Sequence, residues 1–273
     1  MCGCVHTRAR ATLRAVNRSA NFDARPQLAA TISPLISANE CADTREALAW
    51  ASSVGYRGVQ LSATEPGLRP RDLSNSARRD LAATLGRLEL TCSGIDFFIP
   101  PAHFSDPVHV SRAFEAVEAT LEFAATLGRA PVTVALGANE QCEIRHAIAA
   151  AASRLGVGVH LPVVSLDDAA AIELPFAASL DCATVLGAGG KPEELVARLG
   201  ARLGSVRLVD LWRSGLRGAI LEPRESRLDA LALRVALEIA GFTASPLVDA
   251  RQWSNPRRGL EQVLQRWNAL IPA

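Results

Sequence analysis

The stretch ALAWASSVGYRGVQL, residues 47–61, contains the unit that recurs along this chain. Its pattern predicts an amphipathic helix over Ala47–Gly55 and, two residues later, a short apolar strand over Gly58–Leu61. The glycine between them suits the left-handed backbone conformation that often ends a helix and strains other residues. The unit is therefore a helix, a glycine, a short connection and a strand.

Further copies of this unit follow. They pair a helix with a strand over Leu81–Gly86 and Leu88–Cys92, Val110–Gly128 and Pro131–Leu136, Ile144–Gly156 and Val157–Leu161, Leu195–Gly204 and Val206–Leu211, and Leu231–Gly241 and Pro246–Val248. Further strands are expected at Leu28–Ser33 and Phe176–Asp181, which brings the number to eight, with a short crossover over Ser165–Glu173. Strands that alternate with helices pair in parallel, because right-handed crossovers return each strand in the same direction. The chain is therefore expected to form a single-domain α/β fold, a (β/α)8 TIM barrel.

Helix-start signals agree with these boundaries. Asp43 with Glu46 is typical of a capping box, and Ser105-Asp106-Pro107 and Asn255-Pro256 each place a cap before a proline. The first expected strand is followed by Ser33-Pro34-Leu35-Ile36, which lacks the glycine-rich phosphate loop of nicotinamide-binding folds.

Composition narrows the class of protein. A chain of 273 residues, 49% hydrophobic, can bury one core, and barrels use about 250 residues. The net charge of +1 and the lack of like-charge runs argue against a nucleic-acid footprint, and no apolar stretch reaches the ~18 residues of a membrane span. The basic residues are arginines apart from Lys191, which is typical of a GC-rich bacterial genome.

The cysteines and the N-terminal residues bear on location and boundaries. Six cysteines without disulfide-like spacing indicate free thiols in a reducing cytoplasm. Residues 1–26 carry five arginines and one acid, Asp23, and are expected to be a disordered or loosely attached extension; the barrel is expected over residues 27–273.

Polar residues collect where the expected strands end. Those ends meet at one mouth of a barrel, and the residues there are Gln60, Ser62, Asp96, Asn139, Glu140, His160, Asp181, Asp210, Arg213, Asp249 and Arg251, with Trp253 beyond the last strand. Asp181, Asp210 and Asp249 each close an apolar strand. Such a carboxylate can bind a divalent cation, transfer a proton or accept sugar hydroxyls, or it can cap its own loop. The sequence leaves both alternatives open.

Three stretches carry a family resemblance. Gly55-Tyr56-Arg57-Gly58-Val59-Gln60-Leu61, Ser179-Leu180-Asp181 and Val206-Arg207-Leu208-Val209-Asp210 resemble the xylose-isomerase-like TIM-barrel superfamily, over most of residues 28–270. That superfamily includes sugar-phosphate isomerases, ketose epimerases, inosose dehydratase-like proteins and endonuclease IV. The resemblance implies a barrel with an active site at its mouth.

The resemblance also implies a cofactor. Active members hold one divalent metal (Mn²⁺, Mg²⁺ or Zn²⁺) with a Glu on strand five, an Asp on strand six, a His on strand seven and a Glu on strand eight. Here Asp181 matches the strand-six ligand, and Asp249 is a shortened counterpart of the strand-eight Glu. The strand-seven position falls near Arg207, which cannot ligate a cation, and strand five ends His160-Leu161-Pro162 without a Glu. A lone histidine among apolar neighbours is more often packed than a ligand. The metal site is therefore expected to be degenerate or lost.

The resulting expectation is a sugar or sugar-phosphate isomerase or epimerase of carbohydrate metabolism, acting on a small polyhydroxy carbonyl compound. Its site residues are expected to be Asp249, Asp181 and Glu140 for catalysis, Asp181 and Asp249 for the metal, and Gln60, Asp96, His160, Asp210, Arg213 and Trp253 for substrate. The alternative is a non-catalytic barrel that binds a ligand or partner. A DNA-repair endonuclease is disfavoured, because such relatives use many metal-binding histidines and this chain has five. Neither nucleic acid nor a membrane is an expected partner, and a homo-oligomer is left open.

Overall fold

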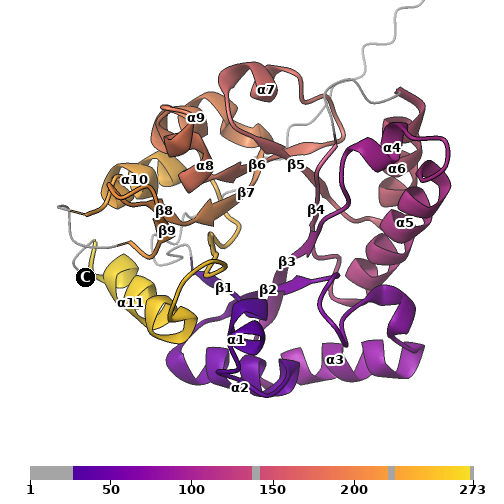
Figure 1. The fold of residues 1–273 in the computed structure, drawn as a ribbon, viewed down its shortest axis with the longest axis horizontal. Coiled ribbons are helices and arrows are strands. Elements are labelled where there is room, and N and C mark those ends of the chain that lie inside the picture. Colours follow the sequence, from indigo (N-terminus) through magenta and orange to yellow (C-terminus); the bar gives the residue numbers. More distant parts are fainter. Residues whose placement is uncertain (1–26, 137–141, 221–224, 271–273) are drawn as a thin grey trace, which may run out of the picture.

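Eight parallel strands close into a barrel, with the helices outside it (Figure 1). The computed structural model describes residues 27–136, 142–220 and 225–270. The strands follow one another around the barrel in the order β1-β10-β7-β6-β5-β4-β3-β2, so the predicted (β/α)8 fold is confirmed. Their bounds are β1 Ala29–Thr31, β2 Gly58–Ser62, β3 Thr91–Phe97, β4 Val132–Val134, β5 Val159–Val163, β6 Ala177–Asp181, β7 Leu203–Leu208 and β10 Leu247–Val248.

The helices occupy the crossovers between strands. They are α1 Ser33–Ser37, α2 Thr44–Val54, α3 Asn75–Arg87, α4 Ala102–Ser105, α5 Val110–Thr126, α6 Cys142–Leu155, α7 Leu166–Ala170, α8 Cys182–Gly187, α9 Pro192–Leu199, α10 Ala230–Ile239 and α11 Pro256–Ala269, with 3-10 turns at Pro70–Asp72 and Gly200–Arg202. Within the described ranges, none of these helices is both long and apolar enough to span a membrane.

The glycine predicted to end the helix has the left-handed conformation in four of the six predicted helix–strand units. Gly55, Gly128, Gly156 and Gly241 have positive φ at or just beyond helix ends, as predicted. The prediction is wrong for Gly86, since α3 continues through it and Glu89 takes the left-handed conformation instead. It is also wrong for the unit of α9, where Gly200 adopts positive φ and Gly204 lies in strand β7.

Strands β3 and β7 differ most from their predicted bounds. Strand β3 begins at Thr91, three residues beyond the predicted start, because Leu88 caps helix α3. The strand also ends at Phe97 instead of the predicted Cys92, so Asp96 lies inside β3 rather than after it. The predicted seventh strand stops at Leu208, and Asp210–Leu211 turns away as β8 to pair antiparallel with β9, Arg217–Gly218.

Side-chain caps fix two of the expected helix starts. Asp43 accepts a hydrogen bond from the backbone N–H of Glu46 at 2.9 Å, and Asn255 accepts one from Arg258 at 3.1 Å. Helix α5, by contrast, begins at Val110 rather than behind Pro107, because Asp106 accepts the N–H of Val108 within a turn.

Small residues close the N-terminal half of the barrel interior. A Cβ atom on Gly204 would lie 2.5 Å from Nε2 of His160, and one on Gly58 would lie 2.9 Å from Cβ of Ala29. This end is filled, as expected for a packed barrel core. The space available to a ligand is therefore at the opposite end, where the strands finish.

Candidate functional site

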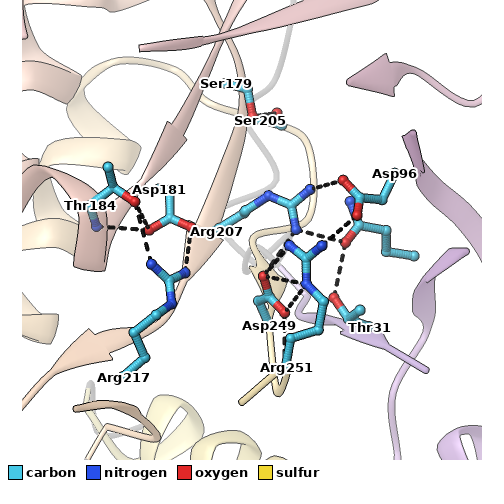
Figure 2. Close-up of polar contacts among 11 residues, drawn as sticks. Thr31, Asp96, Ser179, Asp181, Thr184, Ser205, Arg207, Arg217, Asp249 and Arg251 are labelled. Carbon is cyan, nitrogen blue, oxygen red and sulfur yellow. Dashed lines mark hydrogen bonds and ion pairs between the residues drawn. The ribbon is translucent and has the colours of Figure 1, made fainter. Parts of the chain in front are cut away.

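Arg207 lies in the middle of the barrel mouth. It belongs to β7, and its side chain is buried. Figure 2 shows its guanidinium group beside Asp96. Its Nη2 atom donates to Oδ1 of Asp96 at 2.6 Å, and its Nη1 atom donates to Oδ2 of Asp249 at 3.1 Å. Nη1 also lies 3.2 Å from Oε1 of Gln60. One guanidinium thus joins strands β2, β3 and β7 to the end of β10.

Arg251 completes a closed set of charges. Its Nη1 atom donates to Oδ2 of Asp96 at 2.5 Å, and its Nη2 atom donates to Oδ2 of Asp249 at 2.6 Å. Each carboxylate is therefore bridged by both guanidinium groups. We call Asp96, Arg207, Asp249 and Arg251 the charge ring; its formal charge is zero.

Asp249 stays ionised despite its burial. Burial alone would raise the pKa of Asp249, but hydrogen bonds from Arg251 and the charges of Arg207 and Arg251 outweigh it and lower the pKa to about 2. Burial would lower the pKa of Arg251, and its bonds to Asp249 raise it instead. A buried ion pair is tolerated when its hydrogen bonds are satisfied in this way.

Asp181 lies beside the ring and has two sets of contacts. It ends β6 and is the register partner of Arg207 in β7. Its Oδ1 atom accepts from the N–H of Thr184 at 2.9 Å and caps helix α8, whereas Oδ2 accepts from Nη2 of Arg217 at 2.6 Å. The capping alternative raised by the sequence is thus observed, and the side chain remains 22% exposed at the mouth.

A cavity of about 270 Å³ opens between these groups. Its walls are Asp96, Phe97, Phe98, Thr133, Ala135, Pro162, Val163, Val164, Ser179, Asp181, Thr184, Arg207 and Arg251. This volume is near the lower end of small-molecule sites, about 300–1,000 Å³. The cavity combines carboxylate acceptors and guanidinium donors in one wall.

Gln60 contacts the ring from strand β2. It is fully buried, and its Oε1 atom accepts from Oγ1 of Thr31 at 3.0 Å as well as from Arg207. Its Nε2 atom has no hydrogen-bond partner among the described residues. A buried amide without an acceptor is costly, but Gln60 is not part of the cavity wall.

Asp210 and His160, both predicted to bind substrate, do not line the cavity. Asp210 is fully buried, and it accepts from the N–H groups of Arg227 and Leu228 at 3.1 and 2.9 Å and from the hydroxyl of Ser226. It therefore holds the loop before α10. His160 is buried against Gly204, and burial lowers its pKa to about 4, so its imidazole is neutral near pH 7. Neither residue is part of the cavity wall.

The remaining candidates lie at other hollows or outside the described residues. Arg213 borders an open hollow beside Leu186, and Trp253 lines a hollow of about 450 Å³ with Trp212 and Arg217. Glu140, expected to be catalytic, lies outside the described residues, as do Asn139 and the extension 1–26.

Sequence reasoning missed Arg217 and the central place of Arg207. Arg217 belongs to the β8–β9 hairpin, whose two-residue strands are too short to show a hydrophobic periodicity in the sequence. Arg207 carried a usable signal, because it alternates with Val206 and Leu208 and must therefore face the interior if they face the helices. A charged residue at an interior position of a strand requires a partner of opposite charge.

The residues present do not form the metal-binding set that the resemblance implies. Both carboxylates proposed as ligands, Asp181 and Asp249, are engaged by guanidinium groups, and Arg207 stands on the strand between them. Within the described ranges, no group of three or more His, Cys, Asp or Glu side chains could hold an ion. The local charge does not favour a divalent cation.

The comparison with solved structures supports the fold. No protein-family model matches the chain, and no curated protein matches it in sequence. Among solved structures, a D-allulose 3-epimerase from Methylomonas sp. matches with a TM-score of 0.66 at 17% identity, covering 90% of this chain and 98% of that one. A probable 3-DHS dehydratase, AsbF, from Bacillus anthracis gives 0.70 at 12% identity, covering 89% and 98%.

A xylose isomerase domain protein from Planctomyces limnophilus is also similar, with a TM-score of 0.65 at 14% identity over 90% of this chain and 96% of that one. The chain therefore has the fold of the xylose-isomerase-like TIM barrels. At these identities the similarity establishes the fold alone.

Proposed function

We propose that this protein is an isomerase or epimerase acting on a small polyhydroxy carbonyl compound, a sugar or sugar phosphate, at the mouth of its barrel. The observation that carries the proposal is the cavity of about 270 Å³, whose wall contains Asp96, Asp181, Arg207 and Arg251. Sugar hydroxyls donate to carboxylates and accept from guanidinium groups, so such a wall matches this ligand class. Several proteins of the same fold are named as sugar epimerases.

Asp181 is the described residue best suited to move a proton. It lies on the cavity wall and is partly exposed, and of the three mouth aspartates it is the one outside the charge ring. In the proposed step its carboxylate takes the proton from the carbon next to the carbonyl, and the electron pair moves onto the carbonyl oxygen to give an enediolate. Return of the proton to the former carbonyl carbon, with the hydroxyl proton passing from one oxygen to the other, isomerises the sugar. Return of a proton to the opposite face of the first carbon epimerises it and needs a second acid, a role we assign to Glu140.

Asp249 has a different part in this proposal. Its pKa of about 2 makes it a weak base near neutral pH. It accepts from both Arg207 and Arg251 and so fixes their orientation toward the cavity. We therefore assign Asp249 to positioning rather than to proton transfer.

Hydrogen exchange at the reacting carbon tests the proposal. The full-length protein is incubated in D₂O with a panel of ketoses, aldoses and their phosphates, and proton NMR follows deuterium entering next to the carbonyl. We expect exchange with at least one compound and a loss of about 100-fold or more in Asp181→Asn, the usual scale for a general base. The matched control is Asp167→Asn, an exposed aspartate in the first turn of α7, which should exchange like the parent. A panel without any exchange would reject the catalytic proposal.

A non-catalytic barrel is the second candidate, and one observation favours it. Both carboxylates of the charge ring are already bridged by two guanidinium groups, so neither is free to act as a base. This candidate predicts that panel compounds raise the melting temperature without deuterium exchange, and that Asp181→Asn leaves the protein's biological output intact.

A further inference from the structure

The strand order places an arginine between the two carboxylates expected to bind metal. Arg207 in β7 is the register partner of Asp181 in β6 on one side and of Leu247 in β10 on the other. Asp249 follows Leu247 by two residues and so points to the same face of that segment. An ion shared by Asp181 and Asp249 would therefore meet the guanidinium group of Arg207.

We propose that Arg207 and Arg251 supply the positive charge of this mouth, so that paired oxygens of a ligand are bound by guanidinium groups and not by a divalent metal ion. This inference rests on the proposed function only for the kind of ligand. That ligand is a compound with two neighbouring oxygens that carry negative charge. An enediolate and a phosphate share this chemistry.

The exposed edge of Arg251 is the part that a ligand can reach. Its side chain is 42% exposed and lines the cavity, whereas Arg207 lies beneath it with 6% exposure. The Nε and Nη2 atoms of Arg251 donate to Asp249 and its Nη1 atom donates to Asp96, which leaves the second N–H of each terminal nitrogen for the two oxygens of an anionic group.

The carboxylates of the ring hold these donors in place before a ligand arrives. Asp96 and Asp249 each bind both arginines, so neither guanidinium needs to reorganise on binding. Fixed donors aimed at a developing oxyanion stabilise it more than mobile ones do. The ring thus provides the electrostatic part of what a metal ion provides in other barrels.

Charge balance does not favour a divalent cation. Asp96, Asp181 and Asp249 are matched by Arg207, Arg217 and Arg251, so the mouth has no excess negative charge to attract a divalent cation. An entering cation would have to displace a guanidinium from each carboxylate that it contacts. An anion needs no such displacement.

Metal binding is tested first, independently of any activity. Equilibrium dialysis of the full-length protein against Mn²⁺, and separately against Zn²⁺, is followed by metal analysis of the protein, and thermal unfolding is compared with and without EDTA. We expect no stoichiometric metal and the same melting temperature in each condition. One Mn²⁺ or Zn²⁺ bound per chain, and lost in Asp181→Asn, would overturn the inference.

Anion binding is tested with two probes in the presence of EDTA. Calorimetric titrations use glycolohydroxamate, which presents the paired oxygens of an enediolate, and inorganic phosphate. We expect at least one probe to bind, and Arg251→Gln to weaken it about 10- to 100-fold, the loss typical of one or two charged hydrogen bonds. Arg251→Lys keeps the positive charge without the planar fork, so its affinity for the probe should lie between those of the parent and of Arg251→Gln. The probe that binds more tightly identifies the source of the paired oxygens.

The matched control is Arg154→Gln, an exposed arginine of α6 whose partner is Glu118, which should bind the probe like the parent. Equal affinity in Arg251→Gln and Arg154→Gln, or binding only after Mn²⁺ is added, would contradict the inference. Failure of the two proposals is distinguishable: probe binding without sugar exchange rejects the isomerase alone, whereas exchange that depends on Mn²⁺ rejects the guanidinium site alone.

Discussion

Nη2 of Arg207 lies 2.6 Å from Oδ1 of Asp96, although the two residues are 111 positions apart in sequence. They belong to strands β7 and β3, which stand opposite each other in the barrel order. The ion pair therefore crosses the barrel interior and connects opposite sides of its wall.

Removing one charge of the ring should destabilise the fold. Asp249→Asn leaves Arg207 and Arg251 with a single shared carboxylate, and breaking a buried ion pair costs about 3–5 kcal/mol. We expect the free energy of unfolding, measured in urea, to fall by about 3 kcal/mol, because Asp96 still pairs with both arginines. The control is Asp80→Asn, which breaks the exposed pair with Arg45 and should cost less than about 1 kcal/mol. Equal effects of both variants would contradict the assignment.

His160 should make the fold sensitive to mild acid. Burial lowers its pKa from 6.5 to about 4 in the folded protein, so between these values the unfolded chain binds more protons than the folded chain. Stability therefore declines as pH falls from about 6.5 to about 4, by about 3 kcal/mol from this group.

Urea unfolding across this pH range measures the decline. His160→Gln should flatten the curve, whereas His146→Gln, an exposed histidine of α6, should keep the parent's slope. A parent-like slope in His160→Gln would show that another group causes the decline.

Two glycines should respond in opposite directions to alanine. In Gly204→Ala the new Cβ would lie 2.5 Å from Nε2 of His160 and 2.8 Å from Cβ of Ala177. We expect a loss of about 1–3 kcal/mol from overpacking. Gly86→Ala adds a Cβ with nothing within 4 Å, inside helix α3, and should stabilise by about 0.5–1 kcal/mol. Thermal unfolding of both variants measures these effects. A stabilised Gly204→Ala would show that the N-terminal half of the barrel interior is not filled.

Asp210 should act through the loop that it holds. Asp210→Ala leaves the N–H groups of Arg227 and Leu228 without their acceptor, at an expected cost of about 2–3 kcal/mol. Hydrogen exchange at these two amides should become faster. Asp229→Ala removes the single capping bond to Ala232 at the start of α10 and should cost only about 1 kcal/mol. Unchanged exchange at residues 227 and 228 in Asp210→Ala would show that the loop has another anchor.

Much of the fold could be predicted because its signals are local. The six strands expected at or near β1, β2, β4, β5, β6 and β10 follow from short apolar runs bounded by helix ends. The displaced start of β3 has a local cause that periodicity cannot detect, since Leu88 and Leu90 read as strand residues although Leu88 caps α3 and the strand starts only at Thr91. The turn of Asp210 out of the barrel depends on contacts with residues 226–228, which are distant in sequence.

The sequence by itself determined that this chain forms a parallel barrel and that Gln60, Asp96, Asp181 and Asp249 stand near its mouth. Only the tertiary structure decided which side chains neutralise one another there: Arg207 with Asp96 and Asp249, and Arg217 with Asp181. The physical reason is range. Helix and strand patterns depend on neighbours a few residues apart, whereas a buried charge is paired by whichever opposite charge the closed barrel brings within hydrogen-bonding distance.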